Sequence, residues 1–430
     1  MTLASASSEV ARVLASTRPL PMGDAALRAG LHARRLLFLK SLLVRLERLG
    51  GALGPPARRR FERDWGLLES AERADPSAVR DVLDYPMTGA WLAEALAAPD
   101  GPALERHLAH FGGVALAAAI RAGCPVGGTR TLPTGVLALP GLGTLRRTTP
   151  EVRLTSRAGT VRMADPTGRQ GPVLLRTATR PDDRTARVLG GGPGWSALRT
   201  LPGSAIVLDD LDPYRVPPHG IGPAALPAAE RPESARRLWA QRWSEAHALL
   251  SATDPGRAAE IGTVLRAVVP LAPERRAGGA PRSATARAAP GAVLAQLPDD
   301  GGELAESLVH ETQHTKLAAL HDLSPLCVPG AGTLHRVGWR PDPRPVMGVL
   351  QGVYAHLALV DLWWRAARTP SVPSGWRRRA GPRLEIYREH VGEALSALGE
   401  SDELTLVGRE FVRGMGRHHA SLGGAARSLR

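Results

Sequence analysis

The sequence contains the stretch His310-Glu311-Thr312-Gln313-His314, in which two histidines stand four residues apart. On an α-helix, residues at this spacing lie on one face, so both imidazoles can reach one metal ion. The stretch lies well inside a predicted helix, which begins after a capping turn at residues 299–302 and ends before Pro325. The sequence therefore predicts a divalent transition metal held by His310 and His314. Two histidines packed in an ordinary core are the alternative.

A third protein ligand is expected from elsewhere in the chain, because two imidazoles alone make a weak metal site. His356 is the preferred candidate, since it lies in an apolar stripe of the next predicted helix, residues 345–367. An unpaired imidazole there would be costly, although a hydrogen-bonded core histidine would also satisfy the pattern. His321 and Asp322 follow on the motif helix itself, too far along a straight helix to close on the same ion.

Four further residues are candidates for chemistry at this site. Glu311 suits two roles, a general base for water in a zinc peptidase or a group at an iron site. Tyr354 can contact substrate or pack in the core. Arg340 and Arg344 stand in a proline-stiffened loop, residues 338–345, and arginine suits bidentate binding of a carboxylate. A solvated basic loop is the alternative for these two arginines.

Composition narrows the class of protein. With 430 residues and 43% hydrophobic content, the chain is long enough for two or three domains with a real core. The net charge is +14, but the basic residues are spread along the chain and no nucleic-acid motif accompanies them. We expect an acidic peptide partner and no nucleic acid. No signal peptide or membrane-spanning run is present, which predicts a cytoplasmic protein, and Cys124 and Cys327 are expected to be reduced.

The pattern along the chain predicts an α+β protein. We expect a helical N-terminal region (residues 1–122), a β-rich middle region (123–215) and a mostly helical catalytic half (216–430) with a zincin-like HExxH helix. Helices are predicted at residues 25–49, 58–74, 77–98, 104–121, 230–251, 258–268, 346–367, 383–398 and 402–424. Strands are predicted at residues 135–139, 152–156, 172–176, 204–208 and 291–297. The last strand precedes the motif helix, where an extended peptide can pair with a sheet edge. Asp209, Asp210, Asp212 and Arg215 are expected to cap a turn.

The motifs resemble those of the HExxH-type 2-oxoglutarate-dependent peptide β-hydroxylases of bacterial RiPP clusters. The resemblance covers roughly residues 200 to 370. It is carried by Leu308-Val-His-Glu-Thr-Gln-His-Thr-Lys-Leu317, Trp339-Arg-Pro-Asp-Pro-Arg-Pro345 and Gln351-Gly-Val-Tyr-Ala-His-Leu357, with echoes in Leu208-Asp-Asp-Leu-Asp-Pro-Tyr-Arg215 and Ser283-Ala-Thr-Ala-Arg287. His310, Glu311, His314 and His356 fall on the metal-site motif.

The resemblance implies a function. Iron(II), 2-oxoglutarate and O2 would hydroxylate a β-carbon of a ribosomally made precursor peptide, often beside a radical SAM enzyme of the same pathway. Arg344, with Arg340 second, is the candidate for binding the cosubstrate carboxylate. A zinc-dependent metallopeptidase with Glu311 as base remains the chief alternative. A non-catalytic peptide-binding protein with a vestigial metal site is the third.

Overall fold

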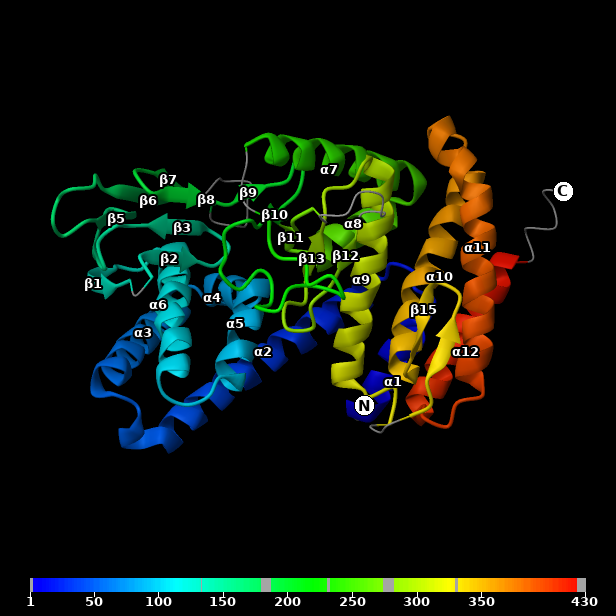
Figure 1. The fold of residues 1–430 in the computed structure, drawn as a ribbon, viewed down its shortest axis with the longest axis horizontal. Helices are drawn as coiled ribbons and strands as arrows, with labels where there is room; N and C mark the ends of the chain where they lie inside the picture. The colour runs from blue at the N-terminus through cyan, green and yellow to red at the C-terminus, as the bar shows by residue number, and fades with distance from the viewer. Residues whose placement is uncertain are drawn as a thin grey trace. The chain divides into compact units, whose positions relative to one another are not determined.

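The computed structural model describes residues 3–132, 134–178, 187–229, 233–273, 282–328 and 332–423 (Figure 1). Helix accounts for 56% and strand for 17%, in several sheets, which confirms a mixed α+β class. The chain divides into two compact units. We call Met1–Gly30, Leu201–Ile206 and Arg231–Arg430 the C-terminal unit, and Leu31–Thr200 with Val207–Glu230 the middle unit. These units cut across the three predicted regions, since the first 30 residues belong to the C-terminal unit.

The middle unit joins the N-terminal helices to the β-rich segment. Its helices are most of α2 (Pro21–Leu49), then η1 (Gly50–Ala52), α3 (Pro55–Ala74), α4 (Pro76–Leu83), α5 (Pro86–Ala97) and α6 (Pro102–Arg121). Five of them begin with proline, which fits the first helical turn because the N–H that proline lacks would have no partner there. The single helix predicted at 77–98 is wrong: it is interrupted at Tyr85, and Pro86 begins a new helix.

Antiparallel sheets complete the middle unit. Five strands follow the order β1 (Gly127–Thr131), β4 (Glu151–Arg157), β5 (Thr160–Ala164), β6 (Val173–Ala178) and β7 (Arg187–Gly191). Three more, β2 (Val136–Leu139), β3 (Gly143–Arg146) and β8 (Trp195–Ala197), form a second sheet, and β9 (Arg199–Thr200) pairs with β10 (Val207–Leu208). Helix α6 packs against β2 at Gly113, where a Cβ would lie 2.1 Å from the Ala138 carbonyl oxygen. That close approach explains the glycine.

The C-terminal unit carries the HExxH helix. Its helices are α1 (Leu3–Leu14), α7 (Glu233–Thr253), α8 (Pro255–Val264), α9 (Gly301–Leu323), α10 (Val346–Arg368), α11 (Ser374–Gly399) and α12 (Leu406–Gly423). Its strands are β11 (Ala267–Pro270), β12 (Ser283–Ala284), β13 (Ala292–Ala295), β14 (His335–Val337) and β15 (Arg340–Arg344). Helix α10 lies between α9 and α11, as Figure 1 shows.

Two predictions in this unit were wrong. The helix predicted at 258–268 ends at Val264, and the chain continues as the buried strand β11. The predicted loop at 338–345 contains most of a β-hairpin, because β14 and β15 pair antiparallel. The strand predicted at 291–297 is present as β13, but it lies between β12 and β11. It therefore has no free edge for a peptide, and β12 is the outer strand on this side.

A buried network of charges fixes α9 against its neighbours. Lys316 of α9 is 1% exposed and pairs with Glu260 of α8 and, at 3.3 Å, with Asp24 of α2. Glu260 also forms an ion pair with Arg257 at 3.2 Å. Arg257 forms a second ion pair with Asp361 of α10 at 3.4 Å. Because buried charges are costly when unpaired, this network constrains how α8, α9 and α10 meet.

Helix α10 is the one described helix that is long and apolar enough to cross a bilayer. In the structure, 83% of its apolar window is buried inside the protein. Its composition is therefore that of a central core helix. The expectation that no run of the sequence is long and apolar enough to span a membrane was therefore wrong for α10, although its burial is that of a core helix.

Candidate metal centre

Helix α9 presents two imidazoles to one point. Its start is fixed by Asp300, whose side chain accepts hydrogen bonds from the N–H groups of Gly302 and Glu303 at 2.8 and 2.9 Å. About two turns after Glu303, the Nε2 atoms of His310 and His314 lie 3.0 Å apart. Two nitrogens bound to one ion at about 2.1 Å lie about 3.0 to 3.4 Å apart for angles between octahedral and tetrahedral. The pair therefore has the spacing of two ligands of one metal.

His356 of α10 supplies a third imidazole next to this pair. Its ring centroid lies 5.0 Å from that of His310. The Nδ1 atom is hydrogen-bonded to the Gly352 carbonyl at 2.8 Å, which fixes the proton on Nδ1 and leaves Nε2 as the basic nitrogen. Burial lowers the pKa of His356 to about 4, so the imidazole is neutral near pH 7, the form that binds a metal.

Gln351 of α10, the residue before Gly352, orients His314. Gln351 Oε1 lies 2.9 Å from His314 Nδ1, so an amide oxygen accepts the proton there and Nε2 is left facing His310. Burial, with the other two imidazoles, holds the pKa of His310 well below its usual range. Two of the three rings thus have their orientation set through Nδ1, as metal-binding histidines commonly do.

The hairpin of β14 and β15 covers His356. Trp339, at its turn, stacks on the His356 ring with centroids 4.5 Å apart and planes 22° apart. Gly352 makes this possible, because a Cβ there would lie 2.5 Å from the Trp339 indole. Gly338 likewise lies against His390 of α11, whose ring a Cβ would meet at 2.3 Å. The turn therefore fits closely against His356 and His390.

Glu311 points to the sheet side of α9. It is 2% exposed, and its Oε1 accepts a 2.8 Å hydrogen bond from Ser283 Oγ in the outer strand β12. Burial raises the pKa of this carboxyl. The carboxylate of this predicted metal-site glutamate thus contacts the strand at the edge of the sheet.

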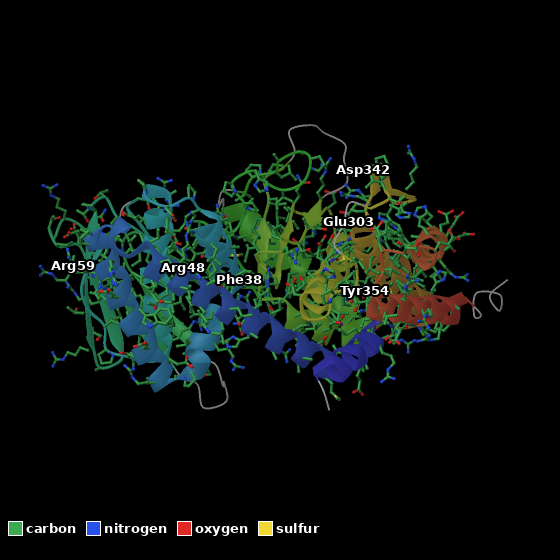
Figure 2. The ribbon with its side chains drawn as sticks, turned by 90° about the horizontal axis from the view of Figure 1, so that it is seen from below. Phe38, Arg48, Arg59, Glu303, Asp342 and Tyr354 are labelled. Atoms are coloured by element: carbon green, nitrogen blue, oxygen red, sulfur yellow. The ribbon has the colours of Figure 1, made fainter. Side chains whose placement is uncertain are left out.

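Tyr354 does not lie with the histidines. Its hydroxyl donates a 3.0 Å hydrogen bond to the Leu14 carbonyl, and its ring packs on Phe411 of α12. Two residues before His356 on a helix is nearly the opposite face, which is why the hydroxyl points into the core. The predicted catalytic role of Tyr354 is therefore corrected. Its placement is that of a tyrosine packed in the core, which was the alternative. In Figure 2 Tyr354 lies well apart from Asp342 of the hairpin.

Arg340 and Arg344 share one face of β15 with Asp342. The Arg340 Nε lies 2.9 Å from Asp342 Oδ1, and the Arg344 Nε lies 3.4 Å from Oδ2. The hydrogen bond from Arg340 lowers the pKa of Asp342. Both arginine side chains are about one-third exposed, at 35% and 37%, and both belong to the hairpin whose turn carries Trp339. The structure thus brings two cations to the element that covers His356.

The rejected ligands have other partners. His321 Nδ1 accepts a 3.2 Å hydrogen bond from the Leu326 N–H just past the end of α9, and Asp322 pairs with Arg287 at 2.8 Å. The acidic turn is structural, as predicted: Asp209 accepts from the N–H groups of Leu211 and Asp212 and from the Tyr85 hydroxyl.

Sequence reasoning missed a polar pair beside the histidines. The Tyr387 hydroxyl of α11 donates a 3.2 Å hydrogen bond to Glu306 Oε2, and the Tyr387 ring lies 5.5 Å from that of His356. Arg383 lies 3.7 Å from the same carboxylate, whose pKa is raised by burial. Glu306 had a local signal, being one turn before His310. Tyr387 had none, because its contact depends on how α11 packs.

Comparisons with known proteins add no family. A scan against protein-family models finds no match, and a search of the curated proteins finds no similar one.

Across the described residues, no three His, Cys, Asp or Glu side chains are grouped closely enough to hold a metal as they stand. The argument that these residues suit a metal ion therefore rests on the His310 and His314 pair, with His356 beside it.

Proposed function

We propose that this chain is an iron(II)- and 2-oxoglutarate-dependent hydroxylase that oxidises a β-carbon of a ribosomally made precursor peptide. The observation that carries the proposal is the 3.0 Å approach of the His310 and His314 Nε2 atoms beside the neutral imidazole of His356. The resemblance of the motifs to peptide β-hydroxylases adds the expected substrate and cosubstrate.

Three imidazoles are a suitable donor set for such a reaction. His310, His314 and His356 would hold the iron and leave coordination positions for a bidentate cosubstrate and O2. Bound iron(II) would supply the redox chemistry by which O2, 2-oxoglutarate and a peptide C–H bond yield succinate, CO2 and a C–OH group. Gln351 and the Gly352 carbonyl keep two rings oriented, and Trp339 shields His356 from water.

The arginines of β15 would bind the distal carboxylate of the cosubstrate. Arg344 and Arg340 now share the carboxylate of Asp342, so a second carboxylate could take over one of them without leaving a buried charge. Asp342 is half-exposed and stays solvated when it gives up a partner. By this exchange the hairpin would clamp a dicarboxylate.

A zinc peptidase is a second candidate, favoured by one observation. Glu311 is next to His310 in sequence, and its Oε2 atom has no hydrogen-bond partner within the described part of the chain. That oxygen would be available to accept a proton from water, as the glutamate of an HExxH peptidase does.

The test incubates anaerobically purified protein with iron(II), 2-oxoglutarate and the precursor peptide encoded beside its gene, then admits O2. A mass gain of one oxygen that requires 2-oxoglutarate, with matching succinate, is the expected result. Peptide cleavage with zinc alone would establish the peptidase instead. No product under either condition would overturn both and favour a peptide-binding protein.

Arginine variants sharpen the test. Arg344→Ala should raise the KM for 2-oxoglutarate about tenfold or more, because it removes a charge-assisted hydrogen bond. Arg336→Ala removes an exposed arginine from β14 of the same hairpin and serves as the matched control. Equal effects of the two variants would show that the hairpin acts only through its overall charge.

A further inference from the structure

An open pocket of about 850 Å³ lies in the C-terminal unit where α9 and α11 begin. One wall is the last turns of α7, with Ala248, Leu249 and Ala252, and the other includes Trp376 of α11. Ala248 is exposed, and Leu249 and Ala252 are half-buried. This wall thus presents small and apolar side chains to solvent, a surface that favours an apolar ligand group.

Two glycines let the helices come this close. A Cβ on Gly301 would lie 2.3 Å from the Glu245 side chain of α7, and one on Gly302 would lie 2.6 Å from the Trp376 indole. The pocket therefore sits at a junction where α7 and α11 both pack on the first turn of α9. Its shape is set by rigid helices rather than by loops.

The charged side chains around the pocket differ in whether they have an ion-pair partner. Glu245 is paired with Arg242 at 3.1 Å and accepts from the Gly301 N–H at 3.1 Å. Asp300 caps α9 and is paired with Arg379 at 2.7 Å. Arg378 is exposed on the same rim, and among the described residues no carboxylate pairs with it. The rim thus offers one uncompensated positive charge beside an apolar wall.

The pocket lies on the same helix as the candidate metal centre. Gly302 is eight residues before His310, which is about 12 Å along α9. An extended peptide covers that distance in about four residues. Between Gly302 and His310 on α9 lies Glu306, which accepts the hydrogen bond from Tyr387 of α11.

We propose that this pocket binds an extended segment of the substrate peptide that carries apolar side chains followed by an acidic one, with the carboxylate on Arg378. The bound segment lies about four residues from the residue that reaches the histidines. The identity of the partner as a substrate rests on the proposed function, but the chemistry of the bound segment follows from the pocket alone.

The test uses three labelled nonapeptides of glycine and serine with a central Leu-Leu-Glu, Leu-Leu-Lys or Ser-Ser-Glu. Their binding to the full, metal-free chain is measured by fluorescence polarisation. Leu-Leu-Glu should bind more tightly than both others. Arg378→Glu should weaken its binding about fivefold and improve that of Leu-Leu-Lys, as expected for an exposed ion pair. Ala252→Phe, which fills the pocket, should weaken both Leu-Leu peptides.

Arg377→Glu is the matched control, since it makes the same charge change on the adjacent exposed residue outside the pocket. Equal loss in Arg377→Glu and Arg378→Glu, or equal binding of all three peptides, overturns the proposal. Binding needs neither metal nor cosubstrate, so it survives if the hydroxylase proposal fails. If the chain does transfer oxygen to a peptide, Arg378→Glu should raise the KM for an acidic precursor and leave kcat unchanged. An unchanged KM would reject the pocket proposal and leave the hydroxylase proposal standing.

Discussion

Hydrogen bonds at Nδ1 hold His314 and His356 in the orientation that a metal needs, through Gln351 and the Gly352 carbonyl. Preset rings of this kind lose less side-chain freedom when an ion binds. The His310 and His314 contact itself depends only on spacing along one helix. This part of the site could be predicted from sequence because it is local.

Replacing one histidine of the pair tests the metal site directly. His310→Ala should reduce bound iron(II) or zinc from about one per chain to nearly none, because two remaining imidazoles bind weakly. Metal content is measured after anaerobic loading and dialysis. His321→Ala, on the same helix but hydrogen-bonded past its end, should keep its metal. Retention of metal by His310→Ala would falsify the assignment.

Gly352 tests the cover over His356. Gly352→Ala places a Cβ 2.5 Å from the Trp339 indole, so the ring must move off the imidazole. We expect metal affinity to fall about tenfold, the lower range for disturbing the surroundings of a ligand. Gly416→Ala, at a glycine inside α12 with open space around it, should leave affinity unchanged and raise stability by up to about 1 kcal/mol. Metal titration of both variants compares them, and equal affinities would contradict a role for Trp339.

At the scale of elements, the face of α9 opposite the histidines is held by charge. Lys316 is buried between Glu260 and Asp24, and Glu260 has Arg257 as a second partner at 3.2 Å. Lys316→Met should therefore destabilise the C-terminal unit by about 3–5 kcal/mol, because it removes the 3.3 Å ion pair of the buried Asp24 and one of the two cations beside Glu260. Urea unfolding measures this loss. Adding Glu260→Gln should recover part of it, and simple additivity of the two changes would contradict direct pairing.

The helices could be predicted from sequence and the connections between them could not. Apolar spacing located α3, α6, α7 and α10 within a few residues, since each has a continuous buried stripe. The prediction failed at β11, whose four buried residues look the same as the end of an apolar helix. Short strands such as β12 have too few residues for a period of two to show.

The missed site residues follow from the same limit. Ser283, Trp339 and Tyr387 reach the centre from β12, from a hairpin turn and from α11. Their contacts depend on how separate elements pack, which residue spacing does not encode. Tyr354 was predicted instead because it is close to His356 in sequence, but two residues along a helix turn a side chain away.

At the scale of the whole molecule, each unit contains a histidine whose pKa is lowered so far that its side chain is neutral near pH 7. Burial lowers the pKa of His110, in α6 of the middle unit, to about 3, and that of His418, in α12 of the C-terminal unit, to about 4. The unfolded chain would protonate both near pH 6.5. Between that pH and the folded pKa, the unfolded state binds more protons, so stability falls as the pH falls.

Lowering the pH should therefore reduce the stability of both units by an effect that does not involve a metal. Their full stability is present above about pH 6.5 and is lost toward pH 4, at up to about 1.4 kcal/mol per pH unit for each histidine. Hydrogen exchange of metal-free protein between pH 4 and 8, read in α6 and α12, follows each unit. His110→Leu should flatten the pH dependence in α6 only. His418→Leu should reduce it in α12 only, because the pKa values of His310 and His356 in the same unit are also lowered by burial and contribute the rest. Slopes that match the unsubstituted chain in both variants would mean that other groups, the buried carboxylates first, control the acid response.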